Sequence, residues 1–264
     1  MIGLIIVGDE ILSGRRQDKH LAKSIELLAE RGLKVSWARY VGDDPDMITA
    51  AIQEALVSGD VVFSFGGIGA TPDDHTRAAA GRALGRPLAL HPEARELILQ
   101  RCRELAEQEG EVFEPESADT MRRLQMGHFP EGADIIPNPY NRIPGFTVAG
   151  RVHFVPGFPV MAWPMVAWVL DTLHQGLHGQ GVEASRAIVV YGAIESKLTP
   201  LMLDIEARFA GIKVFSLPSV DHPVHGRHIE LGVKGASDMV EEAYSALLDG
   251  LSDFGASLGP EVVH

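Results

Sequence analysis

The chain has 264 residues, of which 45% are hydrophobic and 22% are charged, and its formal net charge at pH 7 is −13. This composition predicts an ordinary globular protein with one large domain or two smaller ones. The acidic charge argues against a nonspecific nucleic-acid binder and against a protein of anionic membrane surfaces, because both need a basic surface. The single cysteine, Cys102, excludes an internal disulfide and a thiolate metal cluster, and it fits the reducing cytoplasm.

The N-terminal segment predicts alternating strands and helices. Ile2 to Val7 is continuously apolar, as expected of a parallel strand covered on both faces, and Gly8 to Glu10 follows it as an acidic loop. Leu21 to Arg31 has the apolar spacing of a helix, Leu33 to Val41 is expected to be the next strand, and Gly42 to Pro45 turns into a second helix. No basic leader precedes the first strand, and no apolar run is long enough to span a bilayer.

The segment from Val61 to Ala80 carries the strongest functional signal. Apolar and β-branched residues end abruptly in the glycine-rich loop Gly66 to Gly69, and Thr71 to Leu84 is then predicted to be a helix. Glycines at the carboxyl end of a strand let backbone N–H groups approach an anion, and a helix N-terminus favours negative charge. The loop therefore predicts a cradle for a phosphate or a pterin-sized ligand. Alternatively, it is only a tight turn in which Asp73 and Asp74 cap the helix.

Alternating strands and helices predict parallel βαβ units, whose loops gather at one edge of the sheet. The loops Gly8 to Glu10 and Gly66 to Asp74 should therefore be neighbours. Their acidic residues are Asp9, Glu10, Asp73 and Asp74. Four carboxylates suffice to hold a hard cation such as Mg²⁺ against a pyrophosphate. In the alternative interpretation, these side chains cap helices or face solvent.

The middle of the chain predicts two further helices, the first of which forms a peripheral pair with the helix Thr71 to Leu84, and then a return to the sheet. The helices are expected over Pro92 to Glu109 and over Ser117 to Met126. Val148 to Val155 has the pattern of a hairpin, and Pro156 to Met165 leads into a further helix.

A domain boundary is expected at Gln175 to Ser185, because this segment is glycine-rich and polar. It separates a first domain over residues 1–175 from a small domain over residues 186–254. The order βαββα of the small domain predicts helices on one face of a mainly antiparallel sheet, and the last ten residues are expected to fray. Within this domain, Asp221 to His228 (DHPVHGRH) lacks a known metal-ligand spacing, so a histidine-rich hairpin loop is favoured over a zinc site.

Several motifs occur together in a fixed order. They are GDEILSG (Gly8 to Gly14) followed by Asp18, VGDD (Val41 to Asp44), GGIGATPDDHT (Gly66 to Thr76), NPYNRIPGF (Asn138 to Phe146) and PGFPVMAWPM (Pro156 to Met165). The first 175 residues thereby resemble the molybdopterin-binding domain of CinA-type competence/damage-inducible proteins, a domain similar to those of MoaB and Mog. Ile194 to Ile205 resembles the small domain that follows this fold in CinA-type proteins.

The resemblance implies a three-layer α/β domain with a mainly parallel sheet, followed by the small βαββα domain. It also implies a small-molecule nucleotide or pterin whose phosphates lie on the glycine loop, and a homo-oligomer is expected. The expected ligand-binding residues are Gly8, Asp9, Glu10, Gly14, Asp18, Gly66, Gly67, Gly69, Thr71, Asn138, Arg142, Gly145, Pro156 and Gly157. The expected catalytic residues are Asp73 and Asp74, and the expected metal ligands are Asp9, Glu10 and Asp74. Arg15, Arg16 and Lys19 are further candidates for pairing with phosphate.

Three functions are compatible with the resemblance. The CinA branch implies a hydrolase of a nucleotide pyrophosphate, such as an ADP-ribose-like dinucleotide, that depends on Mg²⁺, Mn²⁺ or Co²⁺. The molybdopterin branch implies a protein that binds or adenylylates molybdopterin, in which Asp74 matches an essential acidic residue. The third is a noncatalytic module that binds a nucleotide or pterin. His20 stands where relatives usually place Asn, which leaves the identity of the ligand open.

Overall fold

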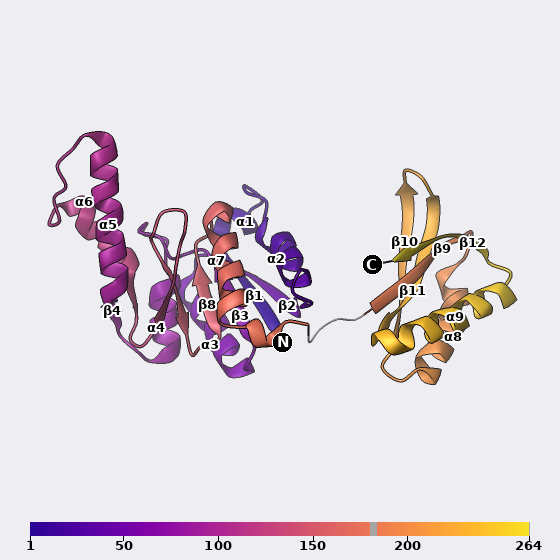
Figure 1. Ribbon diagram of the computed structural model, residues 1–264. Helices are drawn as coiled ribbons and strands as arrows, with labels where there is room; N and C mark the ends of the chain where they lie inside the picture. Colours follow the sequence, from indigo (N-terminus) through magenta and orange to yellow (C-terminus); the bar gives the residue numbers. More distant parts are fainter. Residues whose placement is uncertain (180–183, 264) are drawn as a thin grey trace. The chain divides into compact units, whose positions relative to one another are not determined.

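The computed structural model describes residues 1–179 and 184–263, and it forms two compact units, Met1–Gln180 and Gly181–His264 (Figure 1). Part of the predicted linker lies outside the described residues. At its start a short 3₁₀ helix, η2 (Gln175–Leu177), follows the first unit's last α-helix. At its end Ala184 and Ser185 already belong to a strand, so the prediction that they are linker is wrong.

The first unit is built on a six-stranded sheet. Its strands are β1 (Ile2–Val7), β2 (Trp37–Val41), β3 (Val61–Phe65), β6 (Asp134–Ile136), β7 (Gly145–Val148) and β8 (Val152–Val155). They lie in the order β2-β1-β3-β8-β7-β6. The first four in this order are parallel, and β7 and β6 are added at one side through antiparallel pairing of β7 with β8 and of β6 with β7. The predicted hairpin is β7–β8, and Ala149 and Gly150 take positive φ values of 51° and 66° at its turn.

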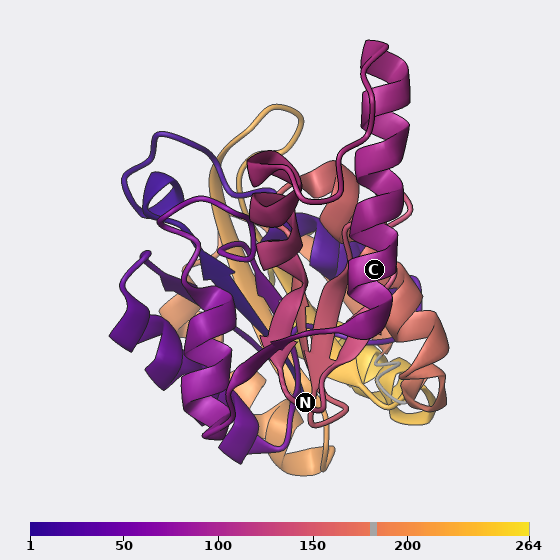
Figure 2. The same cartoon turned by 90° about the vertical axis from the view of Figure 1, so that its left-hand side faces the viewer.

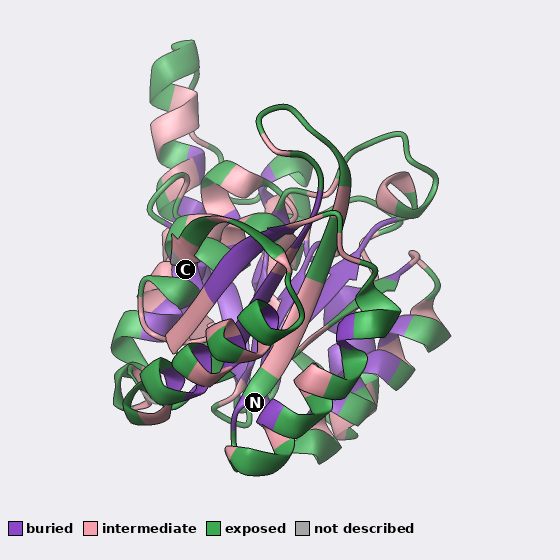
Figure 3. Ribbon diagram, turned by 90° about the vertical axis from the view of Figure 1, so that its right-hand side faces the viewer, coloured by how far each residue is buried: buried purple, intermediate pink, exposed green. Residues whose placement is uncertain are grey.

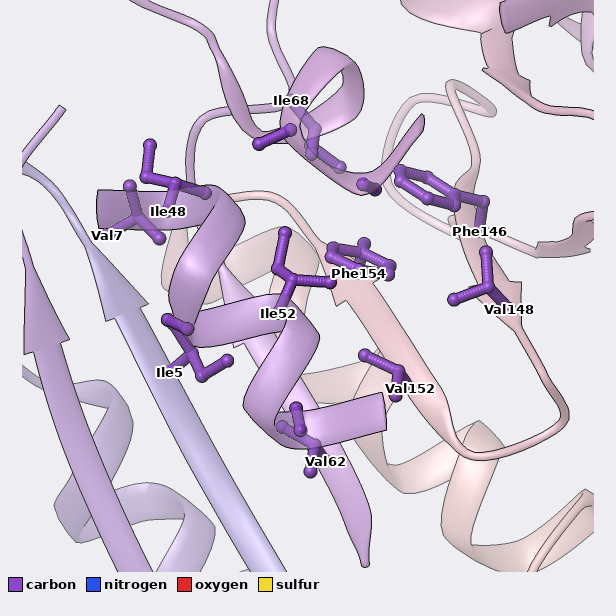
Figure 4. Close-up of a cluster of buried hydrophobic side chains, with 14 of the residues drawn as sticks. Ile5, Val7, Ile48, Ile52, Val62, Ile68, Phe146, Val148, Val152 and Phe154 are labelled. Atoms are coloured by element: carbon purple, nitrogen blue, oxygen red, sulfur yellow. The ribbon is translucent and has the colours of Figure 1, made fainter. Parts of the chain in front are cut away.

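Helices cover both faces of this sheet, which gives three layers. The helices are α1 (Asp9–Leu12), α2 (His20–Ala29), α3 (Pro45–Ser58), α4 (Thr76–Leu84) and α7 (Pro159–Thr172). On one face, Ile48 and Ile52 of α3 pack with Ile5, Val62 and Phe154 of the sheet (Figure 4). On the other face, apolar side chains of α2 and α7 pack against the alternate residues of the same strands. Because β1 is buried on both faces, its sequence is apolar throughout, and the predicted three-layer α/β fold is confirmed.

A smaller segment extends from the side of the first unit. It contains β4 (Leu88–Leu90), α5 (Pro92–Glu109), α6 (Ala118–Leu124), η1 (Gln125–Gly127) and β5 (His128–Pro130), and α5 projects away from the sheet (Figure 2). β4 and β5 form a two-stranded sheet that the sequence did not predict. Cys102 lies in this segment's own apolar cluster, and burial raises the pKa of its thiol. A structural role follows for this cysteine.

The second unit has one strand more than predicted. It contains β9 (Ala184–Tyr191), α8 (Glu195–Arg208), β10 (Lys213–His222), β11 (Gly226–Gly235), α9 (Ser237–Asp253) and β12 (Ser257–Val263), with the antiparallel order β10-β11-β9-β12. Its buried side chains lie on the central strands β9 and β11 and on the inner faces of α8 and α9, whereas the outer helix faces and β10 are largely exposed (Figure 3). The expectation that the last ten residues fray is wrong, because β12 pairs with β9. The register of this pairing shifts between Leu258 and Glu261, where Gly259 and Pro260 lie.

Two histidines of the first unit, the buried His153 and the half-buried His174, lie beside one another. The Nδ1 atom of His153 on β8 lies 2.8 Å from the Thr147 hydroxyl, and its Nε2 atom lies 2.7 Å from Nε2 of His174. Burial, and then the proximity of His174, lowers the pKa of His153 to about 3. Burial also lowers the pKa of His174. Both rings are therefore neutral in the folded protein at neutral pH.

This pair predicts a loss of stability in mild acid. In the unfolded chain a histidine gains its proton below pH 6.5, whereas folded His153 stays neutral down to about pH 3. Protonation therefore favours unfolding, and the free energy of unfolding should fall by about 1.4 kcal/mol for each pH unit below 6.5 through His153 alone. Urea titrations between pH 7.5 and 4.5 measure this slope. All three tryptophans lie in the first unit, so their fluorescence follows that unit.

The variant His153→Gln supplies the control, because it removes the titrating ring. Its free energy of unfolding should be lower at pH 7.5, since the side chain is fully buried, but should depend less steeply on pH. An equally steep slope in the variant would show that other groups cause the acid sensitivity.

Candidate functional site

A cavity of about 570 Å³ opens where the parallel strands β1 and β3 end. It is the place that the topology of an open α/β sheet favours for a ligand. The predicted residues that line it are Gly8, Glu10, Gly66, Gly67, Gly69, Thr71, Asp73, Asp74, Asn138, Pro156 and Gly157. The sequence-based prediction that the Gly8 loop and the Gly66 loop are neighbours is thereby confirmed.

The glycine loop approaches the cavity through backbone rather than side chains. Gly66 and Gly67 have φ values of 93° and 68°, which favour glycine. The Thr76 N–H donates to the Gly67 carbonyl at 2.9 Å, and the Gly66 N–H donates to the Val155 carbonyl at 3.0 Å. These bonds fix the loop between β3, β8 and the start of α4. A Cβ atom at Gly67 would lie 2.2 Å from the buried Thr76 hydroxyl, so the close approach needs glycine.

Asp74 closes the next turn of this loop. Its Oδ2 atom accepts a hydrogen bond from the Thr71 N–H at 2.8 Å and another from the Thr71 hydroxyl. α4 begins at Thr76 and not at Thr71 as predicted, and its N-cap, His75, makes no side-chain cap hydrogen bond. The alternative in which Asp73 and Asp74 are conventional N-caps of this helix is therefore wrong. Thr71 also hydrogen-bonds Asp73 and lowers the pKa of that carboxyl.

The side chain of Arg77 holds the glycine loop through hydrogen bonds to backbone carbonyls. It is almost fully buried, and its guanidinium donates to the Gly69 carbonyl at 2.6 Å and to the Gln125 carbonyl at 2.8 Å. Burial lowers the pKa of Arg77, and the charge of nearby Asp74 partly offsets this shift. The loop is thus fastened to the segment after α6 through a side chain that does not line the cavity.

Acidic side chains from the three segments that follow β1, β2 and β3 lie around the cavity. Glu10 and Asp43 line it together with Asp73 and Asp74. Burial is the main cause that raises the pKa of Asp43, and the negative charges of Asp9, Glu10 and Asp73 raise it further. Such mutual repulsion indicates a site that favours a cation.

Asp9 does not belong to this lining, and its role as a ligand or metal residue stays a prediction. Its N–H donates to Asp43 Oδ2 at 2.9 Å, and its Oδ1 accepts from the Asp43 N–H at 3.2 Å. Asp9 therefore ties the β1 loop to the β2 loop, while Asp43 takes the place beside the cavity. Sequence analysis missed Asp43. The signal was available, because VGDD ends the strand next to β1 in a parallel sheet.

The acidic side chains do not form a ready cage for a metal. Within residues 1–179 and 184–263, no group of three or more His, Cys, Asp or Glu side chains is placed to hold a metal ion. The predicted set Asp9, Glu10 and Asp74 is therefore not preassembled. The histidines of the β10–β11 hairpin also do not make such a site, although the rings of His222, His225 and His228 have centroids 4.9 to 5.7 Å apart.

The NPYNRIPGF segment contributes two asparagines to the cavity, together with Ile143 and Pro144. Buried Asn138 donates to the Asn141 side chain at 2.8 Å and to the Ile143 carbonyl at 3.0 Å, and both asparagines line the cavity. Arg142 does not line it, because its guanidinium pairs with Glu104 of α5 at 2.8 Å. Gly145 is buried in β7, where a Cβ atom would lie 2.2 Å from the Phe154 carbonyl oxygen. The predicted ligand-binding roles of Arg142 and Gly145 are therefore not supported.

Gly14 and Asp18 also lie outside the large cavity. Gly14 sits in an exposed turn with a φ of 72°. Asp18 accepts from the backbone of His20 at 2.8 Å and from the Tyr40 hydroxyl at 2.8 Å, so it fixes the start of α2. Among the basic residues expected to pair with phosphate, Arg16 lines the large cavity and Lys19 lines a smaller cavity beside it. The Arg15 guanidinium instead donates to the Ser13 hydroxyl.

Comparison with known proteins settles the family. The profile described as a probable molybdopterin binding domain matches residues 3–175. The chain belongs to this molybdopterin-binding domain family. This result and the relatives that follow confirm the resemblance seen in the motifs.

CinA-like proteins are among the relatives of this molybdopterin-binding domain protein. One from Anaeromyxobacter dehalogenans strain 2CP-1 is 33% identical over 199 residues, which cover 74% of this chain and 46% of that protein. One from strain 2CP-C is 35% identical over 218 residues, which cover 80% of this chain and 50% of that protein. The chain thus spans about half the length of these curated relatives.

A solved structure supports the same relationship. The crystal structure of the CinA protein from Thermoplasma acidophilum is similar with a TM-score of 0.53 and 29% identity. The match covers 65% of this chain and 96% of that one.

In the described part of the chain, no helix combines the length and apolar character needed to cross a membrane.

Proposed function

We propose that the protein is a hydrolase that uses a divalent metal to cleave the pyrophosphate of a nucleotide such as an ADP-ribose-like dinucleotide. The observation that carries this proposal is a single cavity lined by both a glycine loop and four acidic side chains. A phosphate cradle alone has no need of acidic residues, which repel its ligand. Acidic residues in such a place suit a site that also holds a cation.

The glycine loop supplies the binding half of the mechanism. Backbone N–H groups along Gly66 to Thr71 that are not used within the protein are suited to hold phosphate oxygens, because no side chain at the glycines blocks their approach. Arg77 and Asp74 keep the loop in shape through the Gly69 carbonyl and through Thr71. Arg16, at the cavity wall, adds a positive charge that can pair with the anionic ligand.

The acidic half fits a metal that is bound together with the substrate. Mg²⁺ is usually held by one or two carboxylates plus substrate phosphates and not by a complete protein cage. The absence of a preassembled three-residue set within the described residues is compatible with that mode. Glu10, Asp43 and Asp74 are the residues that would hold the metal. When bound, such a metal neutralises phosphate charge and lowers the pKa of a coordinated water.

A second candidate function is supported by the family itself. Since the chain belongs to the molybdopterin-binding domain family, the same cavity is also suited to a pterin phosphate. In that case Asp74 would serve the transfer of an adenylyl group to the pterin and not hydrolysis. The phosphate position on the glycine loop would be common to both functions.

One assay separates these possibilities. The protein is incubated with ADP-ribose, FAD and ATP in the presence of Mg²⁺, Mn²⁺ or Co²⁺, and the products are identified. We expect ADP-ribose to yield AMP and ribose 5-phosphate without added pterin. Dependence on pterin would instead favour adenylyl transfer, and binding without turnover would favour a noncatalytic module.

A further inference from the structure

The side chain of His20 has one nitrogen that the protein leaves without a partner. His20 begins α2, is 5% exposed, and stacks on Phe65 with a centroid distance of 4.5 Å. Its Nε2 atom lies 3.1 Å from the Gly157 carbonyl oxygen, which can only accept, so Nε2 carries the proton. Burial lowers the pKa of His20 and keeps the ring neutral. Nδ1 is therefore a hydrogen-bond acceptor, and it is buried with no donor among its protein neighbours.

His20 is one of the residues that line a second cavity of about 280 Å³. This cavity adjoins the larger one, because Glu10, Arg16 and Gly157 line both. Its wall combines apolar surface with the polar side chains of Gln17 and Lys19. A wall of this kind suits a ring that carries several hydroxyl groups.

An unsatisfied buried acceptor is costly and calls for a donor. The orientation of the ring is fixed on three sides. Asp18 holds the His20 backbone, Phe65 stacks on the ring, and the Gly157 carbonyl holds Nε2. Gly157 lies against the glycine loop, since a Cβ atom added at Gly157 would be 3.4 Å from Gly66 Cα. The position of the His20 ring is therefore coupled to the glycine loop through the Gly157 carbonyl.

We propose that His20 Nδ1 accepts a hydrogen bond from a ring hydroxyl of the ligand, in the part that lies beyond the pyrophosphate and occupies the second cavity. His20 is then a specificity-determining residue for a ligand with a second ribose. The inference rests on the proposed function, since it assumes that the pyrophosphate lies on the glycine loop.

The test uses two probes that cannot be hydrolysed. They are the α,β-methylene analogue of ADP-ribose and α,β-methylene ADP, which lacks the second ribose. Their dissociation constants are measured by calorimetry with Mg²⁺ for the wild-type protein and two variants. His20→Gln places an amide near the Nε2 position, where it can still donate to Gly157, but it has no acceptor at the Nδ1 position. His20→Asn places its amide near the Nδ1 position, where its oxygen can still accept, but it has no donor at the Nε2 position.

We expect the wild-type protein to prefer the ribose-bearing probe. His20→Gln should weaken its binding by about tenfold and leave the shorter probe unchanged. His20→Asn should keep the preference, even if both probes bind less tightly. An unchanged preference in His20→Gln, or an equal loss for both probes, would overturn the role of Nδ1 and leave the proposed function standing. If the wild-type protein bound neither probe, the proposed function would fail, and this inference with it.

Discussion

Replacing Asp74 with Asn is expected to lower the turnover of a nucleotide pyrophosphate by roughly two or more orders of magnitude, while ligand binding persists. Asn has the size of Asp, and its oxygen can still accept from the N–H and hydroxyl of Thr71. The substitution removes the negative charge beside the phosphates. Arg77 loses a nearby countercharge, but its two carbonyl contacts remain, so the melting temperature should change little.

A matched substitution tests whether the effect is local. Asp46 is 91% exposed at the side chain and pairs with Arg82 on the surface, so Asp46→Asn makes the same chemical change away from the cavity. Its turnover should equal that of the wild-type protein. Steady-state kinetics and thermal melts of the two variants provide the comparison. If Asp74→Asn retained full turnover, the carboxylate would only brace the loop through Thr71, and its assignment as a catalytic residue would be wrong.

The substitution Gly67→Ala should abolish detectable ligand binding and lower the free energy of unfolding of the first unit by about 3 kcal/mol. Two causes add. The φ of 68° is unfavourable for alanine, and the new Cβ atom would lie 2.2 Å from the Thr76 hydroxyl and 3.1 Å from the Thr76 Cβ atom. Because Thr76 is fully buried, the loop must move instead, and the N–H groups would no longer converge.

Gly85→Ala separates these causes. Gly85 ends α4 with a φ of 64°, and a Cβ atom there would meet nothing within 4 Å. The free energy of unfolding of Gly85→Ala should fall by about 1 kcal/mol, from backbone strain alone, and its ligand binding should be normal. Urea unfolding monitored by tryptophan fluorescence and calorimetry with the ADP-ribose analogue measure both effects. Equal losses in the two variants would mean that contact with Thr76 contributes nothing.

The sequence was most informative where one local pattern had one structural solution. The apolar run of β1 and the glycines after β3 predicted buried parallel strands, and parallel strands bring their loops to one edge. The cavity lies there. The start of α4 could not be predicted, because Pro72, Asp73 and Asp74 are favourable both in a first helical turn and in a loop. Only the packing of Thr76 under Gly67 decides between them.

Two predicted site residues, Asp9 and Arg142, lie outside the cavity lining for a common physical reason. Asp9 and Arg142 were chosen from short motifs, but each side chain found a partner distant in sequence, Asp43 and Glu104 respectively. Such partners depend on tertiary geometry, which a motif does not encode. The same limit explains β12, whose pairing with β9 compensates for a glycine and a proline that are unfavourable in an isolated strand.

The buried guanidinium of Arg77 has a consequence for how the first unit moves. A guanidinium is a rigid plane, and its two ends here hold carbonyls that belong to the glycine loop and to η1, 56 residues apart in the sequence (Gly69 and Gln125). Neither segment can shift by an ångström unless it breaks a hydrogen bond to this part-buried guanidinium. The smaller segment that contains α5 and α6 and leads into η1 is thereby mechanically joined to the glycine loop.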